Sequence, residues 1–216
     1  MNHVVVVGAG LSGVRSVEAL RARGFGGRIT LIGQERHRPY DRPPLSKSVL
    51  LGDADSSFVD SDLAALEVDF WPGVAAKALR EGAVETTEGE LGYDGLVIAT
   101  GAEPILLPGD GPQHVLRTLD DSLELRARLV PGARVAVIGA GWIGAEVATA
   151  ARRAGCAVTV VEAAPPRSRT PSGPSSAPAP STGTRASTCA WTPWSPPSRK
   201  AAWRWSAAGS WTPTWW

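Results

Sequence analysis

The sequence predicts an α/β protein containing two βαβ units, and two glycine-rich turns with their flanking patterns are the observations behind this prediction. The turns are Gly8-Ala9-Gly10-Leu11-Ser12-Gly13 and Gly139-Ala140-Gly141-Trp142-Ile143-Gly144. Each follows a short run of β-branched and small apolar residues and precedes a stretch with helical periodicity. One such turn is weak evidence, whereas two, each between strand and helix, indicate a Rossmann-like architecture with two dinucleotide sites.

The first unit begins with Val4–Val7, an uninterrupted β-branched run typical of a central parallel strand buried on both faces. Residues 13–23 are expected to form a helix that ends in the glycine-rich stretch 24–27, and residues 28–32 to form the next strand. An acid beyond that strand normally accepts hydrogen bonds from an adenosine ribose, and Glu35 takes this place.

Each glycine of the first turn has a separate expected role. Gly8 permits the tight turn, Gly10 lets backbone N–H groups approach a pyrophosphate, and Gly13 lets helix and strand pack closely. The partial positive charge at the helix N-terminus favours phosphate there. Gly139, Gly141 and Gly144 are expected to do the same in the second turn.

The stretch between the two units is harder to interpret. Residues 35–51 are rich in Arg and Pro, so no regular element is expected before Leu45. A short helix from about Leu63 and a strand over 74–79 follow, and residues 84–87 and 96–99 resemble a hairpin leading to Ala99-Thr100-Gly101.

The second unit is predicted from its pattern in the same way. A helix is expected over 119–129, a strand over 134–138, a helix over 144–154 and a strand over 157–161. Glu162 follows the last strand and takes the place of the ribose acid. A carboxylate there would repel a 2′-phosphate, so NADH is expected in preference to NADPH.

A family resemblance is carried by motifs that occur in a fixed order: the first unit, Asp41-Arg42-Pro43-Pro44-Leu45-Ser46-Lys47, Tyr93-Asp94 leading into Ala99-Thr100-Gly101, Leu116-Arg117-Thr118, and Gly141-Trp142-Ile143-Gly144-Ala145-Glu146. Over residues 3–164 the chain resembles the FAD-dependent ferredoxin and rubredoxin reductases, NADH-linked enzymes of the pyridine nucleotide-disulfide oxidoreductase superfamily to which apoptosis-inducing factor is related. The resemblance implies that the first turn binds FAD and the second binds NADH.

The resemblance also implies roles for individual residues. Lys47 is expected near the reactive flavin nitrogen, paired with Glu146 as the catalytic residues, because a cation there favours reduced flavin and a carboxylate keeps the ammonium charged. The other residues implied to contact a cofactor are Arg42, Ala76, Thr100, Gly101, Arg117 and Trp142. The histidines are scattered, so no metal site is expected.

Composition excludes several other classes of protein. The net charge is +1, which gives no sign of a nucleic-acid partner, and no apolar run approaches the roughly 20 residues of a membrane span. Cys156 and Cys189 are too few for a disulfide framework, and residues 42–47 lack the cysteine pair of disulfide reductases. Electrons are therefore expected to leave the flavin directly for an iron–sulfur protein, in a cytoplasmic setting.

The composition changes sharply after Glu162. Residues 165–216 contain no Leu, Ile, Val, Phe, Met or acid, yet hold seven of the nine tryptophans, so no packed core is expected there. A natural disordered tail is one explanation. A frameshift in GC-rich DNA fits better, because out-of-frame reading there favours Ala, Arg, Gly, Pro, Ser, Thr and Trp.

Three parts are therefore expected: the N-terminal part of an FAD-binding domain at 1–110, the start of an NAD-binding domain at 111–164, and a disordered low-complexity tail at 165–216. The function implied is electron transfer from NADH through FAD to a ferredoxin or rubredoxin, impaired by C-terminal truncation. Two alternatives are a non-catalytic dinucleotide-binding fragment or pseudogene product, and another flavin reductase such as the flavin subunit of a nitrite reductase.

Overall fold

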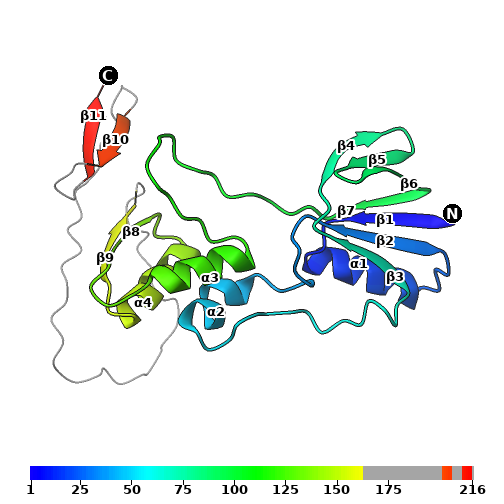
Figure 1. Ribbon diagram of the computed structural model, residues 1–216, viewed down its shortest axis with the longest axis horizontal. Helices are drawn as coiled ribbons and strands as arrows, with labels where there is room; N and C mark the ends of the chain where they lie inside the picture. The colour runs from blue at the N-terminus through cyan, green and yellow to red at the C-terminus, as the bar shows by residue number, and fades with distance from the viewer. Residues whose placement is uncertain (163–200, 206–210, 216) are drawn as a thin grey trace, which may run out of the picture.

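A computed structural model of the chain describes residues 1–162, 201–205 and 211–215. Within residues 1–162 the elements form two groups (Figure 1). One holds a four-stranded parallel sheet, a helix and a small antiparallel sheet, and the other holds a two-stranded parallel sheet with the remaining helices. The chain passes between the groups along residues 34–42, 52–67 and 99–118.

The parallel sheet has the strand order β3-β2-β1-β7. Its strands are β1 (His3–Val7), β2 (Arg28–Gly33), β3 (Val68–Pro72) and β7 (Gly95–Ile98). Helix α1 (Leu11–Ala22) connects β1 to β2 in the predicted βαβ unit. The α/β prediction with a glycine turn between β1 and α1 is therefore confirmed.

Both faces of strand β1 are buried, as its continuous run of valines predicts. On one face a core cluster joins α1 to the sheet and contains Val4, Val6, Val17, Ile29 and Leu31. On the other face a second cluster joins the parallel sheet to the antiparallel one and contains Val5, Val7, Ile32, Val74, Val84 and Leu91.

The antiparallel sheet contains β4 (Ala76–Arg80), β5 (Ala83–Thr86) and β6 (Gly89–Gly92) in that order. The expected hairpin between 84–87 and 96–99 is wrong in one respect: β5 pairs with β6, whereas β7 pairs with β1. The tight turn depends on Gly89, whose φ is +113°.

The expected helix from Leu63 does not form. Residues 63–67 make a single turn instead, which the Asp62 carboxylate caps by accepting hydrogen bonds from the backbone N–H groups of Ala64 and Ala65. Glu67 then adopts a φ of +49°, and the chain enters β3, which pairs in parallel with β2. The sequence interpretation did not contain β3.

Residues 43–51 hold two short helical elements where an irregular segment was expected before Leu45. The 3-10 helix η1 spans Pro43–Ser46, and the helix α2 spans Ser48–Leu51. Pro43 and Pro44 are compatible with η1 because they occupy its first positions, where an N–H has no helical partner to lose.

The second βαβ unit agrees with its prediction. It consists of β8 (Arg134–Ile138), α4 (Trp142–Arg153) and β9 (Ala157–Val161), and the two strands are parallel. Helix α3 (Leu119–Arg128) precedes it and begins with a capping box. In this box Thr118 accepts from the N–H of Asp121, and Asp121 accepts from the N–H of Thr118.

Segment 43–51 packs with the second unit. Leu45 and Val49 share a cluster with Leu119 of α3, and Leu50 shares one with Val137 and Val147. In Figure 1, α2 lies beside α3 and α4, away from the parallel sheet.

The expected disordered tail at 165–216 lies mostly outside the described residues. Within that range the structure describes β10 (Ala201–Trp205) and β11 (Trp211–Trp215), which pair antiparallel. Regular pairing was not expected there. Tryptophan and threonine favour strands, and a two-stranded ribbon, in which both strands are edges, tolerates Pro213.

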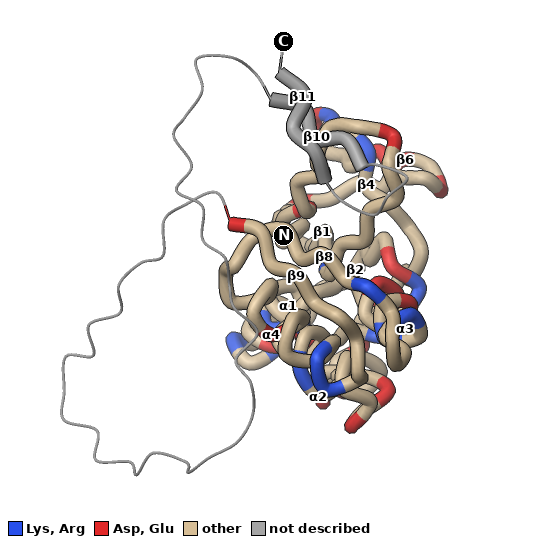
Figure 2. The backbone as a smooth tube through the Cα atoms, turned by 90° about the vertical axis from the view of Figure 1, so that its left-hand side faces the viewer, with Lys and Arg blue, Asp and Glu red and all other residues tan. Residues whose placement is uncertain are grey.

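Within the described ranges, no helix has the length and apolar character needed to cross a membrane. The same part of the chain holds no cluster of His, Cys, Asp or Glu that is suited to a metal ion. Acidic and basic residues lie interspersed along the described chain in the view of Figure 2.

Candidate functional site

The first glycine turn has the geometry that pyrophosphate binding requires. Gly8 has a φ of +109°, and a Cβ on it would overlap the carbonyl oxygen of Ala99 at the end of β7. A Cβ on Gly13 would overlap the carbonyl oxygen of Gly8, so α1 and the turn need a glycine there. By contrast, a Cβ on Gly10 would meet no atom within 4 Å, so the space above the turn is open.

The second turn repeats this arrangement. Gly139 has a φ of +97°, and a Cβ on Gly144 would overlap the carbonyl oxygen of Gly139. A Cβ on Gly141 would meet nothing within 4 Å. Helix α4, like α1, has a glycine N-cap, a residue with no side chain to cap the helix N-terminus.

These observations fit dinucleotides in both turns. Leu11, Ser12, Trp142 and Ile143 are the first residues of their helices, so their backbone N–H groups lie at the helix N-termini where phosphate is favoured. Leu11, Trp142 and Ile143 are exposed. A side chain at Gly10 or Gly141 would fill the space that a phosphate needs.

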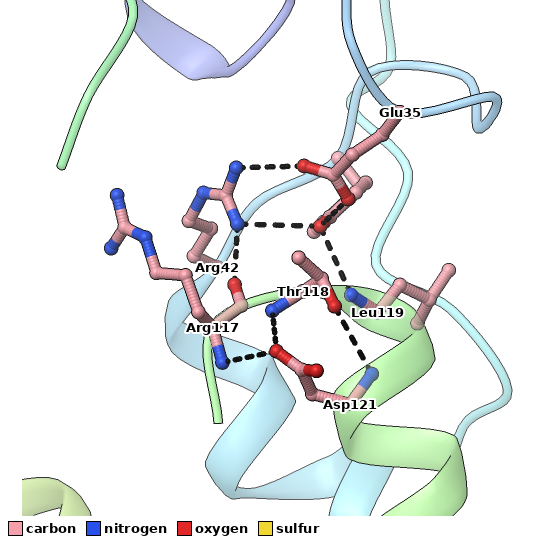
Figure 3. A network of polar contacts seen from close by, with 7 residues as sticks. Glu35, Arg42, Arg117, Thr118, Leu119 and Asp121 are labelled. Atoms are coloured by element: carbon pink, nitrogen blue, oxygen red, sulfur yellow. Dashed lines mark hydrogen bonds and ion pairs between the residues drawn. The ribbon is translucent and has the colours of Figure 1, made fainter. Parts of the chain in front are cut away.

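Glu35 lies just beyond β2, and its carboxylate is held on both oxygens (Figure 3). Arg42 Nη2 donates to Oε1 at 2.9 Å, and the Tyr40 hydroxyl donates to Oε2. The position is close to the first turn, because Gly33 at the end of β2 packs on Ala9: a Cβ on Gly33 would lie 2.7 Å from that of Ala9.

Arg42 extends the same network to the segment before α3 (Figure 3). Its Nη1 donates to the carbonyl oxygen of Arg117, and its guanidinium lies 5.4 Å from the ring centroid of Tyr40. The backbone N–H of Arg117 in turn donates to Asp121 at 2.9 Å. Arg42 thus links the end of β2 to the N-terminus of α3.

Thr100, Gly101 and Arg117 lie at the same edge of the sheet. Thr100 follows Ala99, whose carbonyl oxygen contacts the turn at Gly8. Gly101 has a φ of +75°, and a Cβ on it would lie 3.1 Å from Arg117 Nη2. The guanidinium of Arg117 therefore lies against the backbone that leaves β7.

Lys47 and Glu146 form an ion pair between segments that are 99 residues apart in sequence. Lys47 Nζ lies 3.1 Å from Glu146 Oε2 and also donates to the carbonyl oxygen of Pro43 at 3.2 Å. The hydroxyl of Ser46, which is buried, donates to the same Glu146 oxygen. Glu146 lies on the first turns of α4, so the pair joins segment 43–47 to the helix behind the second glycine turn.

The charge of Glu146 is stabilised by these neighbours. The hydrogen bond from Ser46 has the largest effect and lowers the pKa of the Glu146 carboxyl below its usual range. Partial burial opposes this effect, and the Lys47 ammonium adds to it. Glu146 is therefore an anion at neutral pH with two donors on one oxygen.

The remaining predicted residues lie apart from these contacts. Ala76 begins β4 and is exposed, on the antiparallel sheet. Glu162 lies next to the second turn, since its Oε2 accepts from the N–H of Ala140 at 2.7 Å. Trp142 is exposed at the start of α4.

Three residues of the network were absent from the sequence interpretation. Tyr40, Ser46 and Asp121 each donate to or accept from a predicted site residue. Two of them could have been found, because Tyr40 and Ser46 lie within or next to the Arg-Pro-Pro-Leu-Ser-Lys motif. Asp121 carried a signal of another kind, the Thr-x-x-Asp spacing of a capping box.

The chain matches the family described as pyridine nucleotide-disulphide oxidoreductase over residues 2–171. It therefore belongs to that family, with the Rossmann-like folding pattern already described. The match includes both glycine turns and every predicted site residue.

Individual relatives and solved structures show which members of this family the chain is similar to. The ferredoxin–NAD(+) reductase component of the p-cumate 2,3-dioxygenase system of Pseudomonas putida is 38% identical over 174 residues, covering 76% of this chain and 43% of the relative. The crystal structure of Fdr9 is 53% identical with a TM-score of 0.74, covering 76% and 42%. A chain in the crystal structure of the covalent putidaredoxin reductase–putidaredoxin complex is 37% identical with a TM-score of 0.68, covering 74% and 42%.

The coverages show how much of each relative corresponds to this chain. The chain spans about two-fifths of the length of the relatives that it matches. The part that matches the family, residues 2–171, contains both glycine turns and the Lys47–Glu146 pair.

Proposed function

We propose that this chain carries the dinucleotide-binding portion of a flavoprotein oxidoreductase that takes electrons from NADH through FAD to a ferredoxin-type iron–sulfur protein. The carrying observation is the pair of glycine turns with matching geometry, the second of which is followed by a helix whose Glu146 pairs with Lys47. The acceptor is supported by the names of the relatives, among them a ferredoxin–NAD(+) reductase component and a reductase complex with putidaredoxin.

The first turn is proposed as the FAD site. The N–H groups at the start of α1 would hold the pyrophosphate above Gly10, and Glu35 would accept from the adenosine ribose. Arg42, Thr100, Gly101 and Arg117 would line the route toward the flavin, and Ala76 would meet the adenine through its backbone. We assign residues 1–110 to this site, although segment 43–51 packs with the second unit.

The second turn is proposed as the NADH site, within residues 111–164. The Glu162 carboxylate, which accepts from the N–H of Ala140, would also accept from a ribose 2′-hydroxyl, and its negative charge would repel the 2′-phosphate of NADPH. Trp142, exposed at the start of α4, would line the nicotinamide side of the site.

The Lys47–Glu146 pair would control the charge between the two sites. The bound flavin supplies the hydride-accepting and single-electron chemistry. Lys47 would place a positive charge beside the flavin, and Glu146, which contacts the ammonium at 3.1 Å, would orient it. Ser46 in turn fixes the oxygen of Glu146 that Lys47 contacts.

Cofactor retention and reduction test this proposal. The purified chain is mixed with FAD, freed of excess cofactor and inspected for visible flavin absorbance, with FMN as the matched control because it lacks the adenosine. NADH is then added without oxygen, and NADPH in a parallel sample. The chain is expected to retain FAD but not FMN, and NADH is expected to bleach the bound FAD.

One other result identifies the alternative of a non-catalytic fragment, and another contradicts the proposed function. A chain that retains FAD but is not bleached by NADH is a dinucleotide-binding fragment without reductase activity. A chain that retains neither cofactor contradicts the proposed function. If NADH bleaches the bound flavin, ferredoxin and rubredoxin are then added in separate samples. The rate at which each protein is reduced identifies the acceptor.

A further inference from the structure

Tyr40 makes contacts that a tyrosine serving only to fill the core would not need. Its side chain is 5% exposed, and its hydroxyl contacts both the Glu35 carboxylate and the backbone N–H of Leu119, the latter at 3.0 Å. A carboxylate only accepts and a backbone N–H only donates. The phenol hydrogen is therefore directed at Glu35, and the phenol oxygen accepts from Leu119.

This arrangement fixes the carboxylate that lies beside the first glycine turn. Arg42 holds Oε1 of Glu35 and Tyr40 holds Oε2, so neither oxygen is free to rotate away. The guanidinium of Arg42 also lies over the Tyr40 ring, at 5.4 Å from its centroid. The three side chains therefore fix one another, as Figure 3 shows for the hydrogen bonds.

The same hydroxyl also reaches the second unit. Leu119 is the first residue of α3, and its N–H has no acceptor within that helix. Tyr40 supplies that acceptor, so one phenol is bonded both to the residue after β2 and to the first turn of α3.

We propose that Tyr40 is a positioning residue that orients Glu35 as the acceptor for the ribose of a bound adenosine nucleotide and ties that orientation to the N-terminus of α3. The proposal rests on the proposed function, which places an adenosine nucleotide in the first turn. Burial and then the hydrogen bond to Glu35 raise the pKa of the Tyr40 phenol above its ordinary value, in agreement with a phenol that keeps its proton for the carboxylate.

The test begins without any ligand. The chain contains two tyrosines, so Tyr93→Phe is a matched control for Tyr40→Phe, and Tyr93 packs its ring on the core cluster around Val5. The phenolate absorbance is followed as pH rises within the range where the circular dichroism shows a folded chain. Tyr40 is faced by Glu35, Arg42 and the edge of the His37 ring, and Glu35→Gln removes the charge that Tyr40 contacts.

In Tyr93→Phe the remaining phenol, that of Tyr40, is expected to ionise only at high pH, as it does in the unaltered chain. In Glu35→Gln the Tyr40 phenol is expected to ionise at a lower pH. A phenol that filled the core alone would ionise unchanged in Glu35→Gln, and that result would overturn the coupling between the two side chains.

The second step uses ADP and 2′-deoxy-ADP as probes. The unaltered chain and Tyr93→Phe are expected to bind ADP more tightly than the deoxy form. Tyr40→Phe is expected to lose about tenfold of that preference. Its melting temperature is expected to fall a few degrees below that of Tyr93→Phe, because the buried N–H of Leu119 loses its acceptor, while its circular dichroism stays that of a folded chain. An unchanged preference in Tyr40→Phe rejects the positioning role alone, whereas no binding of either probe or of FAD by the unaltered chain rejects the proposed function as well.

Discussion

Glu146 Oε2 accepts hydrogen bonds from both Ser46 and Lys47, although Glu146 lies about a hundred residues further along the chain. The two donors are neighbours at the end of η1, and the acceptor lies near the start of α4. The contact thus joins segment 43–47, whose Lys47 is proposed to lie beside the flavin, to the helix that follows the second glycine turn. Four predictions follow from this contact and from the geometry of the two turns.

Lys47→Gln is expected to slow the bleaching of bound FAD by NADH roughly tenfold to a hundredfold, because it removes a positive charge beside the site of reduction. Lys47 is 55% exposed and Glu146 29%, so the pair itself is expected to contribute less than about 1 kcal/mol to folding. Stopped-flow absorbance measures the rate and thermal melting the stability. Arg15→Gln, which breaks the exposed pair with Glu18 on α1, is the control, and an equal slowing there would contradict the role of Lys47.

Ser46→Ala is expected to raise the pKa of Glu146 toward its ordinary value, because the hydroxyl is the largest cause of the lowering. A carboxyl with a lowered pKa in the folded state stabilises that state above its unfolded pKa and loses this effect as pH falls through the folded pKa. The variant should therefore lose less stability between pH 7 and pH 3 than the unaltered chain. A carbon-13 NMR titration of Glu146 measures the pKa directly, and Ser46→Thr should restore it.

Alanine at the glycines of the two turns should separate folding from binding. Gly13→Ala and Gly144→Ala place a methyl group on the carbonyl oxygens of Gly8 and Gly139, so each should destabilise the fold by about 1–3 kcal/mol or more. Gly10→Ala and Gly141→Ala meet open space, so the melting temperature of each should change little. The first of this pair should lose FAD and the second NADH, measured by absorbance and by calorimetry. Retained binding in both would show that phosphate does not occupy that space.

Glu162→Gln should weaken the discrimination between NADH and NADPH, because it removes the negative charge beside the second turn but keeps an oxygen to accept from Ala140. Binding of each nucleotide is measured by calorimetry in the variant and the unaltered chain. An unchanged ratio would mean that Glu162 does not face the 2′-position. Glu90→Gln on β6, an exposed carboxylate of the antiparallel sheet, is the control for a general change of charge.

Local patterns were sufficient for the elements with one clear signal. Strands β8 and β9 have the predicted bounds, because β-branched runs between glycines leave few alternatives. Strand β3 was missed and a helix was expected near Leu63, because Asp62 does cap a turn of helix-favouring residues there. The turn ends at Glu67, whose φ is +49°, and the chain then pairs with β2 from Val68 onward. Propensity does not include such a pairing between strands that are distant in sequence.

The candidate site was predictable in a different way. The glycine turns follow from spacing, because each glycine has a steric reason that acts within a few residues. The approach of Lys47 to Glu146 came from family resemblance, since no local period relates residues so far apart. Ser46 was not singled out because its partner Glu146 lies 100 residues further along the chain. Tyr40, five residues from its partner Glu35, was passed over because it stands just before the motif on which the resemblance rests.

The packing of segment 43–51 shows that order along the chain and membership of a core differ in this molecule. Leu45, Val49 and Leu50 come from the first half of the sequence, yet they are buried in cores with α3 and α4. A shortened chain that ended before α3 would therefore expose these three apolar side chains and leave Lys47 without Glu146. A fragment meant to isolate the first glycine turn has to include the second unit, or have these side chains replaced by polar ones.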